Sequence, residues 1–388
     1  MKVAITGVGI VDTLGNNPDL CFDNYMNKEH YPESCRSEHP AISHLKCFYA
    51  DDELLVPETI QTSLYNSLHK INKLGLHSIE QALQTVPKSR NVAVVFSTIT
   101  ASGESNFQFH EYVNGRAKRL RPRGLIQAPR DFLAGLVPQV YDFDGLSVSM
   151  NAACSSSLYC VDYATKLVDE YDYVIVGGAD VGTHLGELAY FNELGAIGTK
   201  SCPYDQDRDG FIMGEGAGCI ILESVEKVEK RQGKVFGYIR GVGKGNDGSA
   251  GKATAPDPNS SGIKKAMREA TKNFPIDYIT FVNAHGTSTP VGDELEYHAI
   301  QEVLGDIDVV SFKSKIGHTM GASGVIELIY TLQAMKNGII PPNHNIENLV
   351  EGLENVSTKP QGDVGAYALK NSLAFGGKNV SVLIEGRN

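Results

Sequence analysis

Short apolar runs alternate with helical patterns along most of the chain. The first 15 residues form an alternating apolar stretch broken by glycines, which predicts an opening β-strand. Residues 146–150 predict another strand, and a helical pattern follows it from Ser155 to about Val168. Residues 309–312 predict a further strand, followed by a helical pattern from about Ala322 to Lys336. Strands that alternate with amphipathic helices indicate a layered α/β architecture.

The second part of the chain repeats features of the first. The segment Ile5–Gly9 is echoed by Ile239–Gly243, which has the same spacing of two glycines. Each part also ends in a β-rich stretch after a glycine pair, Gly177-Gly178 in the first and Gly376-Gly377 in the second. A chance likeness between short apolar strings is the alternative to an internal repeat.

A charged stretch, Glu223–Lys234, separates the two parts. It predicts the end of a strand followed by a short solvated helix or turn. We therefore predict two related halves, residues 1–234 and 235–388, which together form one layered α/β/α body.

Charge and composition narrow the class of protein. The formal net charge of −11 argues against nucleic acid as the main partner, although Arg116–Arg123 is locally basic. No run of about 18 apolar residues occurs, so no membrane span is predicted. The opening stretch also lacks the continuous apolar core of a signal peptide. Seven cysteines without paired spacing fit a reducing compartment, and we expect the cytoplasm.

Strings that imitate nucleotide and metal motifs fail on their spacing. Gly7-x-Gly9 would need a third glycine where Asp12 stands. Asp205-x-Asp207-x-Asp209-Gly210 begins like a calcium loop, but its twelfth position is Gly216 in place of a bidentate acid. No His/Cys spacing resembles a zinc site. We therefore expect neither a metal nor a nucleotide cofactor.

Cys154 is the cysteine best placed to be a nucleophile. It lies between a predicted strand and a predicted helix, and a helix N-terminus stabilises a thiolate through unpaired N–H groups. Small residues surround it, which leaves room for a substrate. A buried structural cysteine is the alternative, and it is the interpretation we give to Cys160, Cys202 and Cys219.

Two histidines follow predicted strands in the second part of the chain. His285 comes directly after an apolar run at residues 281–284, and His318 comes six positions after the predicted strand 309–312. Ligands in α/β sheets bind where strands end, so both histidines are candidates for the site of Cys154. A packed or solvated histidine is the alternative for each.

These residues lie in motifs that resemble those of the β-ketoacyl synthases. Five strings occur in the order of that family and cover nearly the whole chain: Asn151–Ser156, Pro203–Gly218, Asn283–Asp293, Lys313–Gly324 and Asn371–Gly377. The resemblance implies the thiolase fold, with two duplicated α/β halves in a five-layered α-β-α-β-α body, usually as a homodimer. A heterodimer with a related synthase is the alternative.

The resemblance also implies a decarboxylative condensation. Cys154 would accept an acyl group from the phosphopantetheine thioester of an acyl carrier protein. A malonyl carrier would then lose carbon dioxide and attack the acyl thioester, with His285 and His318 stabilising the negative charge on the thioester oxygen. Backbone N–H groups of Cys154 and Phe375 would hold the tetrahedral intermediate, and Phe375 matches a gating aromatic.

Further positions match supporting residues of the family. Lys313 matches a lysine that supports the second histidine, and Glu327 matches its acidic partner. Thr287 and Thr289 match hydroxyls that bind the pantetheine arm. Because the carrier protein is strongly acidic, we expect it to dock on basic side chains. The candidates are Lys118, Arg119, Arg121 and Arg123, with Lys70 and Lys73 near a second contact; a solvated loop is the alternative.

Two departures from the family leave the substrate open. Cys202 stands where elongating synthases commonly have an arginine, and Ala374 replaces a glycine in the C-terminal loop. Members that condense starter units have Asn in place of the second histidine, and chain-length-factor partners lack the cysteine. Both functional classes stay open. One is an elongating enzyme of fatty-acid or specialised polyketide or polyene synthesis, and the other is a poorly active partner of a second synthase.

Overall fold

The computed structural model describes residues 2–248, 255–362 and 364–387. Ten strands form one path of a mixed sheet, and β2 and β3 extend it at the side of β7. The strands are β1 (Val3–Asp12), β2 (Glu33–Ser34), β3 (Lys46–Phe48), β4 (Val92–Ser97), β5 (Ser147–Val148), β6 (Tyr173–Val181), β7 (Met213–Ser224), β8 (Gly237–Asn246), β9 (Ile279–Asn283), β10 (Asp308–Val310), β11 (Tyr367–Ser372) and β12 (Lys378–Gly386).

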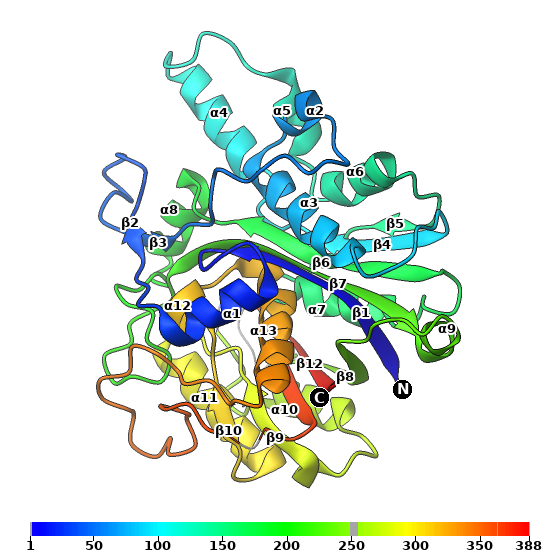
Figure 1. Cartoon of the computed structure of the whole chain (residues 1–388). Coiled ribbons are helices and arrows are strands. Elements are labelled where there is room, and N and C mark those ends of the chain that lie inside the picture. The colour runs from blue at the N-terminus through cyan, green and yellow to red at the C-terminus, as the bar shows by residue number, and fades with distance from the viewer. Residues whose placement is uncertain (1, 249–254, 363, 388) are drawn as a thin grey trace.

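Helices lie on both faces of this sheet and between its two parts (Figure 1). They are α1 (Pro18–Asn27), α2 (Thr62–Tyr65), α3 (Lys70–Leu83), α4 (Gly103–Val113), α5 (Pro122–Gln127), α6 (Phe132–Tyr141), α7 (Ser156–Ala164), α8 (Leu185–Glu193), α9 (Val225–Lys230), α10 (Ser261–Ala270), α11 (Pro290–Leu304), α12 (Lys313–Ile316) and α13 (Ser323–Asn337), with short 3-10 turns η1 (Ile276–Tyr278) and η2 (Met320–Ala322).

The strand order shows the internal repeat. It runs β10-β9-β11-β12-β8-β1-β7-β6-β4-β5, and β8 pairs with β1 at its centre. Outward from that pair, each side has two antiparallel pairings followed by two parallel pairings. The two halves of the sheet are therefore built alike, as the sequence predicted. The domain boundary at residue 234 stays a prediction.

The layers follow from where the helices pack. α3 covers β1, β6 and β7 on one outer face, and α10 covers β8 and β12 on the other. α7 and α13 lie between the two half-sheets, because α7 contacts β6 and β12 while α13 contacts β7 and β11. The largest apolar cluster fills this middle layer and includes Leu158, Val161, Ile326 and Ile329. This arrangement is the predicted five-layered body (Figure 1).

Three local predictions differ from the structure. The strand predicted over residues 146–150 is only two residues long, and Lys313–Ile316 forms a short helix where a loop was expected. The pair Gly177-Gly178 lies inside β6 and does not precede a strand. Gly177 has no room for a side chain there, because a Cβ would lie 2.2 Å from the carbonyl oxygen of Gly218 on β7.

The charged stretch 223–234 takes the predicted form. β7 ends at Ser224, whose side chain caps α9 by accepting a hydrogen bond from the Lys227 amide. Among the described residues, no helix combines the length and the apolar character that a membrane crossing requires.

Candidate active site

A sharp turn places Cys154 at the beginning of α7. Ala153 has a φ of 49°, in the left-handed region that costs a residue with a Cβ about 1–2 kcal/mol. Side chains on both sides hold the turn: Asn151 Oδ1 accepts from the Ala153 amide at 3.1 Å, and Ser156 Oγ accepts from the Ala152 amide at 2.8 Å. The thiol that results is 8% exposed. The turn lies between β5 and α7 and therefore places the Cys154 thiol at the cavity.

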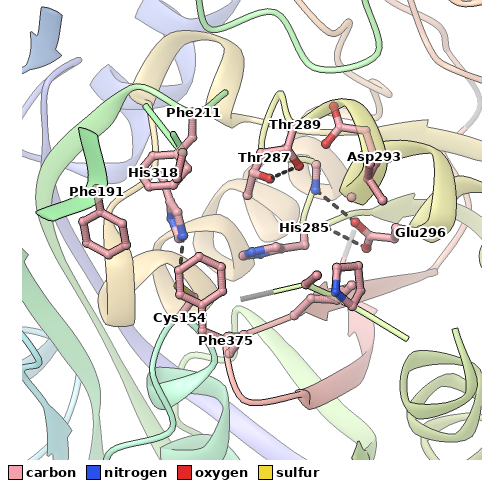
Figure 2. A pocket seen from close by; sticks show the side chains of 18 of the residues that line it. Cys154, Phe191, Phe211, His285, Thr287, Thr289, Asp293, Glu296, His318 and Phe375 are labelled. Atoms are coloured by element: carbon pink, nitrogen blue, oxygen red, sulfur yellow. Dashed lines mark hydrogen bonds between the residues drawn. The ribbon is translucent and has the colours of Figure 1, made fainter. Parts of the chain in front are cut away.

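The two predicted histidines meet at this thiol. The Nε2 atom of His318 lies 3.1 Å from the Sγ atom of Cys154. The rings of His285 and His318 have centroids 5.3 Å apart at an interplanar angle of 84°, and Phe211 packs against the His318 ring. Figure 2 shows both rings pointing into the cavity that Cys154 borders. The structure thus brings together three residues that are far apart in the sequence.

Burial keeps all three groups neutral. It raises the pKa of the Cys154 thiol to about 12, although the nearby Lys313 ammonium acts in the opposite direction. Burial, followed by the charge of Lys313, lowers the pKa of His318 to about 3 and that of His285 well below its usual value. Desolvation of the anion thus opposes the stabilisation of a thiolate that is expected from the helix N-terminus.

Neutral imidazoles suit the role of hydrogen-bond donors. The Nδ1 atoms of His285 and His318 are buried and have no hydrogen-bond partner among the described residues. An unpaired buried N–H is costly, so the favoured tautomer carries its proton on Nε2. For His318 this proton points to the sulfur of Cys154.

Lys313 and Glu327 lie behind the histidines. The Nζ atom of Lys313 donates to Glu327 Oε1 at 2.6 Å and to the carbonyl oxygen of His285 at 2.7 Å. Both side chains are buried, and Glu327 is on the central helix α13. Burial alone would raise the pKa of Glu327, but the adjacent Lys313 and Lys370 ammonium groups hold it below its usual value. The carboxylate is thus charged and fixes Lys313 against the His285 loop.

Two buried residues of this network were missed in the sequence. Lys370 on β11 donates to Glu327 Oε2 at 2.5 Å. Glu296 on α11 accepts from the amides of His285 and Gly286 at 2.8 and 3.0 Å. The available signal for Lys370 was a lysine within the apolar run Tyr-Ala-Leu-Lys. For Glu296 it was a glutamate on the helix that follows the histidine loop.

The cavity in front of Cys154 has a volume of about 350 Å³. Thr287 and Thr289 line it and lie 3.1 Å apart through their hydroxyl oxygens. Phe375 also lines it, and its ring packs 6.2 Å from that of Phe191 (Figure 2). Phe375 is 36% exposed and precedes Gly376, whose φ of 79° is in the left-handed region. The cavity is thus bordered by an aromatic side chain on a turn that needs glycine.

The predicted docking residues fall into two groups. Lys118, Arg119, Arg121 and Arg123 are exposed on the segment from α4 into α5, and none has an ion-pair partner among the described residues. Lys70 differs, because its ammonium pairs with Glu215 at 2.6 Å and Asp52 at 2.5 Å.

These ion pairs and its exposure of only 19% distinguish Lys70 from the other candidates, and its place on the docking surface stays a prediction. Lys73 is half-buried, with its ammonium 5.2 Å from the centre of the Tyr65 ring.

Comparison with known proteins places the chain in a family. Residues 1–228 match the sequence profile described as "Beta-ketoacyl synthase, N-terminal domain", and residues 236–347 match "Beta-ketoacyl synthase, C-terminal domain". The 3-oxoacyl-[acyl-carrier-protein] synthase 1 of Haemophilus influenzae is 29% identical over 100% of this chain and 99% of its own length. The 3-oxoacyl-[acyl-carrier-protein] synthase 2 of Vibrio cholerae is 34% identical over 66% of each chain.

Solved structures share the fold over the whole chain. A β-ketoacyl synthase from Burkholderia phymatum has a TM-score of 0.89 at 24% identity and covers 100% of both chains. The ishigamide ketosynthase/chain length factor has a TM-score of 0.89 at 23% identity, covering 100% of this chain and 99% of that one. With the two sequence profiles, which together span most of its length, these findings show that the chain belongs to the β-ketoacyl synthase family.

Proposed function

We propose that the chain is a 3-oxoacyl-[acyl-carrier-protein] synthase that uses Cys154 as its nucleophile. The observation that carries this proposal is the contact between His318 Nε2 and Cys154 Sγ, with His285 beside it in the same cavity. Relatives that are named for this activity align over the full chain. The class of enzyme is an acyltransferase.

The first half-reaction transfers an acyl group to Cys154. The Cys154 sulfur attacks the carbonyl of the acyl thioester, the C–S bond to the pantetheine breaks, and the thiol proton of Cys154 passes to the departing pantetheine sulfur. His318, whose Nε2 already carries a proton, acts in this step as a hydrogen-bond donor to the Cys154 sulfur. Since the free thiol and imidazole are both neutral, charge develops only during this step, and backbone N–H groups at Cys154 and Phe375 are the proposed donors to the oxyanion. The Phe375 amide has no acceptor among the other described residues.

The second half-reaction forms the carbon–carbon bond. The malonyl thioester loses carbon dioxide, and the electron pair of the broken bond becomes an enolate whose oxygen accepts from His285 and His318. The enolate carbon then attacks the acyl carbonyl, and the Cys154 sulfur leaves and is protonated. One proton is consumed, and the products are carbon dioxide, the free thiol and a 3-oxoacyl thioester on the carrier. Thr287 and Thr289, which line the cavity, are the proposed contacts of the pantetheine arm.

The proposed partners are an acyl carrier protein and a second synthase chain. Exposed Lys118, Arg119, Arg121 and Arg123 offer an acidic carrier a cluster of unpaired charges. Farther along the segment, Leu125 and Ile126 are 82% and 62% exposed, which supports a contact with a second chain beside these charges, in a homodimer or in a heterodimer with a related synthase. The neighbouring structures include a ketosynthase in complex with its chain length factor.

All seven cysteines are free thiols, which supports a reducing compartment such as the cytoplasm.

Acylation of Cys154 tests this function directly. The protein is incubated with acyl carriers of different chain length and then measured by intact-protein mass spectrometry. We expect a mass increase equal to one acyl group, which a Cys154→Ala variant does not show. The dependence on chain length would define the acyl pocket and separate primary fatty-acid from specialised substrates. Absence of any adduct on the folded protein would favour the alternative of a non-catalytic partner subunit.

A further inference from the structure

Lys370 is a buried cation to which the condensation chemistry described above gives no role. Its side chain is 0% exposed in the middle of β11. The Nζ atom donates to Glu327 Oε2 at 2.5 Å, to the carbonyl oxygen of Ala284 at 3.0 Å and to Asn283 Oδ1 at 3.4 Å. These three oxygen atoms match the three N–H donors of an ammonium group. A charge at such depth is tolerated only with full pairing, so the surroundings of Nζ are built for a cation.

The position of Lys370 follows from sheet register. β11 pairs with β9 in parallel, and Lys370 lies opposite Asn283, the last residue of β9. Asn283 in turn donates to the carbonyl oxygen of Glu327 at 2.8 Å and to the hydroxyl of Thr331 at 2.9 Å. Lys370 therefore connects three elements at the point where β9 passes into the loop of His285.

The two buried lysines make parallel contacts. Lys370 holds the carbonyl of Ala284, and Lys313 holds the carbonyl of the next residue, His285. They also share one carboxylate, since Lys370 binds Glu327 Oε2 while Lys313 binds Oε1. Without Lys370, one carboxylate oxygen and one carbonyl would lose this donor at the base of the His285 loop. A small displacement of a group that contacts a reacting atom lowers the reaction rate strongly.

The charge of Lys370 also acts on the histidines. The cluster of Lys313, Lys370 and Glu327 carries two positive charges and one negative charge. After burial itself, the ammonium groups of Lys313 and Lys370 both lower the pKa of His285 and of His318. An extra positive charge behind neutral imidazoles favours an anion in front of them, which is what decarboxylation produces.

We propose that Lys370 is a positioning residue of the condensation: its ammonium locks Glu327 and the end of β9 so that His285 presents its N–H to the enolate. The inference rests on the proposed function, because it concerns the same reaction. It adds a residue on β11, whereas Lys313 is on α12, and assigns it to the decarboxylation step. It leaves acyl transfer to Cys154, whose thiol contacts His318, largely unaffected.

The test compares Lys370→Met with the wild-type protein. Met keeps the length of the side chain and removes the charge. Release of carbon dioxide from malonyl carrier is measured for kcat and KM, and acylation of Cys154 is measured on the same samples. We expect kcat for decarboxylation to fall on the order of 100-fold, with KM and acylation changing less than about threefold.

Two further variants separate positioning from a loss of stability. Lys227→Met removes another lysine that donates to three backbone carbonyls, those of Val168, Asp169 and Tyr171, and that lies on α9, outside the cluster of Lys313, Lys370 and Glu327. It should lower Tm and leave kcat unchanged.

Lys370→Ala leaves space for a small cation, and methylammonium chloride should restore decarboxylation at least tenfold with saturation. Tetramethylammonium chloride at equal ionic strength should not. A cation that binds only the folded state also stabilises that state. Lys370→Ala with methylammonium therefore tests the proposal even if Lys370→Met does not fold.

These experiments test the proposed function and the positioning role of Lys370 separately. A wild-type protein that releases no carbon dioxide would overturn the proposed function itself. An active wild type with an equally active Lys370→Met would overturn the positioning role alone. The positioning role would also be overturned if Lys227→Met loses as much kcat as Lys370→Met, or if the two ammonium salts give equal rates in Lys370→Ala.

Discussion

The Nε2 atom of His318 lies 3.1 Å from the Sγ atom of Cys154, and both groups are neutral in the free protein. The two residues come from the two halves of a duplicated fold, one before α7 and the other before α13, the helices of the middle layer. The repeat thus brings a nucleophile and a hydrogen-bond donor together. Negative charge develops at the site only when a substrate reacts there.

Alkylation of Cys154 should therefore show no reactive thiolate at neutral pH. A raised thiol pKa means that the anion is scarce below it, so the alkylation rate should rise about tenfold per pH unit. The rate with iodoacetamide is followed by peptide mass spectrometry between pH 6 and pH 10. A plateau below pH 8 would show that the helix N-terminus or His318 generates a stable thiolate, contrary to this prediction.

Removal of His285 should separate the two half-reactions. His285→Ala is expected to retain acylation of Cys154, because its ring is not the one in contact with the sulfur. Decarboxylation of malonyl carrier should fall about 10²–10³-fold, the usual loss for one donor to a developing oxyanion. His298, an exposed histidine on α11, gives the matched control His298→Ala with unchanged rates. Equal loss of acylation and decarboxylation in His285→Ala would contradict this division of roles.

Neutralising Glu327 should be costly to stability. Glu327→Gln keeps the shape of the side chain but leaves Lys313 and Lys370 without a counter-charge in the interior. Breaking a buried ion pair in this way lowers the free energy of unfolding by about 3–5 kcal/mol. Urea unfolding followed by circular dichroism measures the change, with the exposed Glu193→Gln as a control near zero. A loss below about 1 kcal/mol would argue that the carboxylate is not the counter-ion of both lysines.

Charge reversal on the α4–α5 segment tests carrier docking. The double variant Lys118→Glu/Arg119→Glu should raise KM for the acyl carrier several-fold, more at low salt than at high salt, and leave kcat nearly unchanged. Lys265→Glu/Lys272→Glu makes the same change in net charge at exposed positions elsewhere. If KM is unchanged in the first pair, or rises equally in both pairs, the segment is not the docking surface.

The sequence predicted the fold well where its pattern was long and strongly periodic. α7, α13 and the opening strand lie where expected, because each buries a continuous apolar face. Predictions were weaker where short elements depend on distant partners. Gly177 is inside a strand because β7 passes too close for a side chain, and no local pattern encodes that approach.

The sequence identified the residues that meet at the cavity, and Lys313 and Glu327 behind them, but it missed Lys370 and Glu296. Cys154, His285 and His318 stand in recognisable strings, and the structure places them around one cavity. Lys370 and Glu327 are 43 positions apart, so their ion pair is set by sheet register and not by a motif. The ion pair of Lys70 was not foreseen for the same reason, since its partner Glu215 lies on a distant strand. The burial that raises the pKa of Cys154 was not foreseen, because a helix terminus is visible in a sequence while the depth of burial is not.

A complete turnover would show whether Cys154 carries the condensation. Purified protein is given an acyl carrier and a malonyl carrier, and the carrier products are identified by intact-protein mass spectrometry with and without Cys154→Ala. The account predicts a 3-oxoacyl carrier longer than the starting acyl group by one two-carbon unit, with an acylated Cys154 as intermediate. A folded wild-type protein that forms neither the adduct nor the extended product would contradict it.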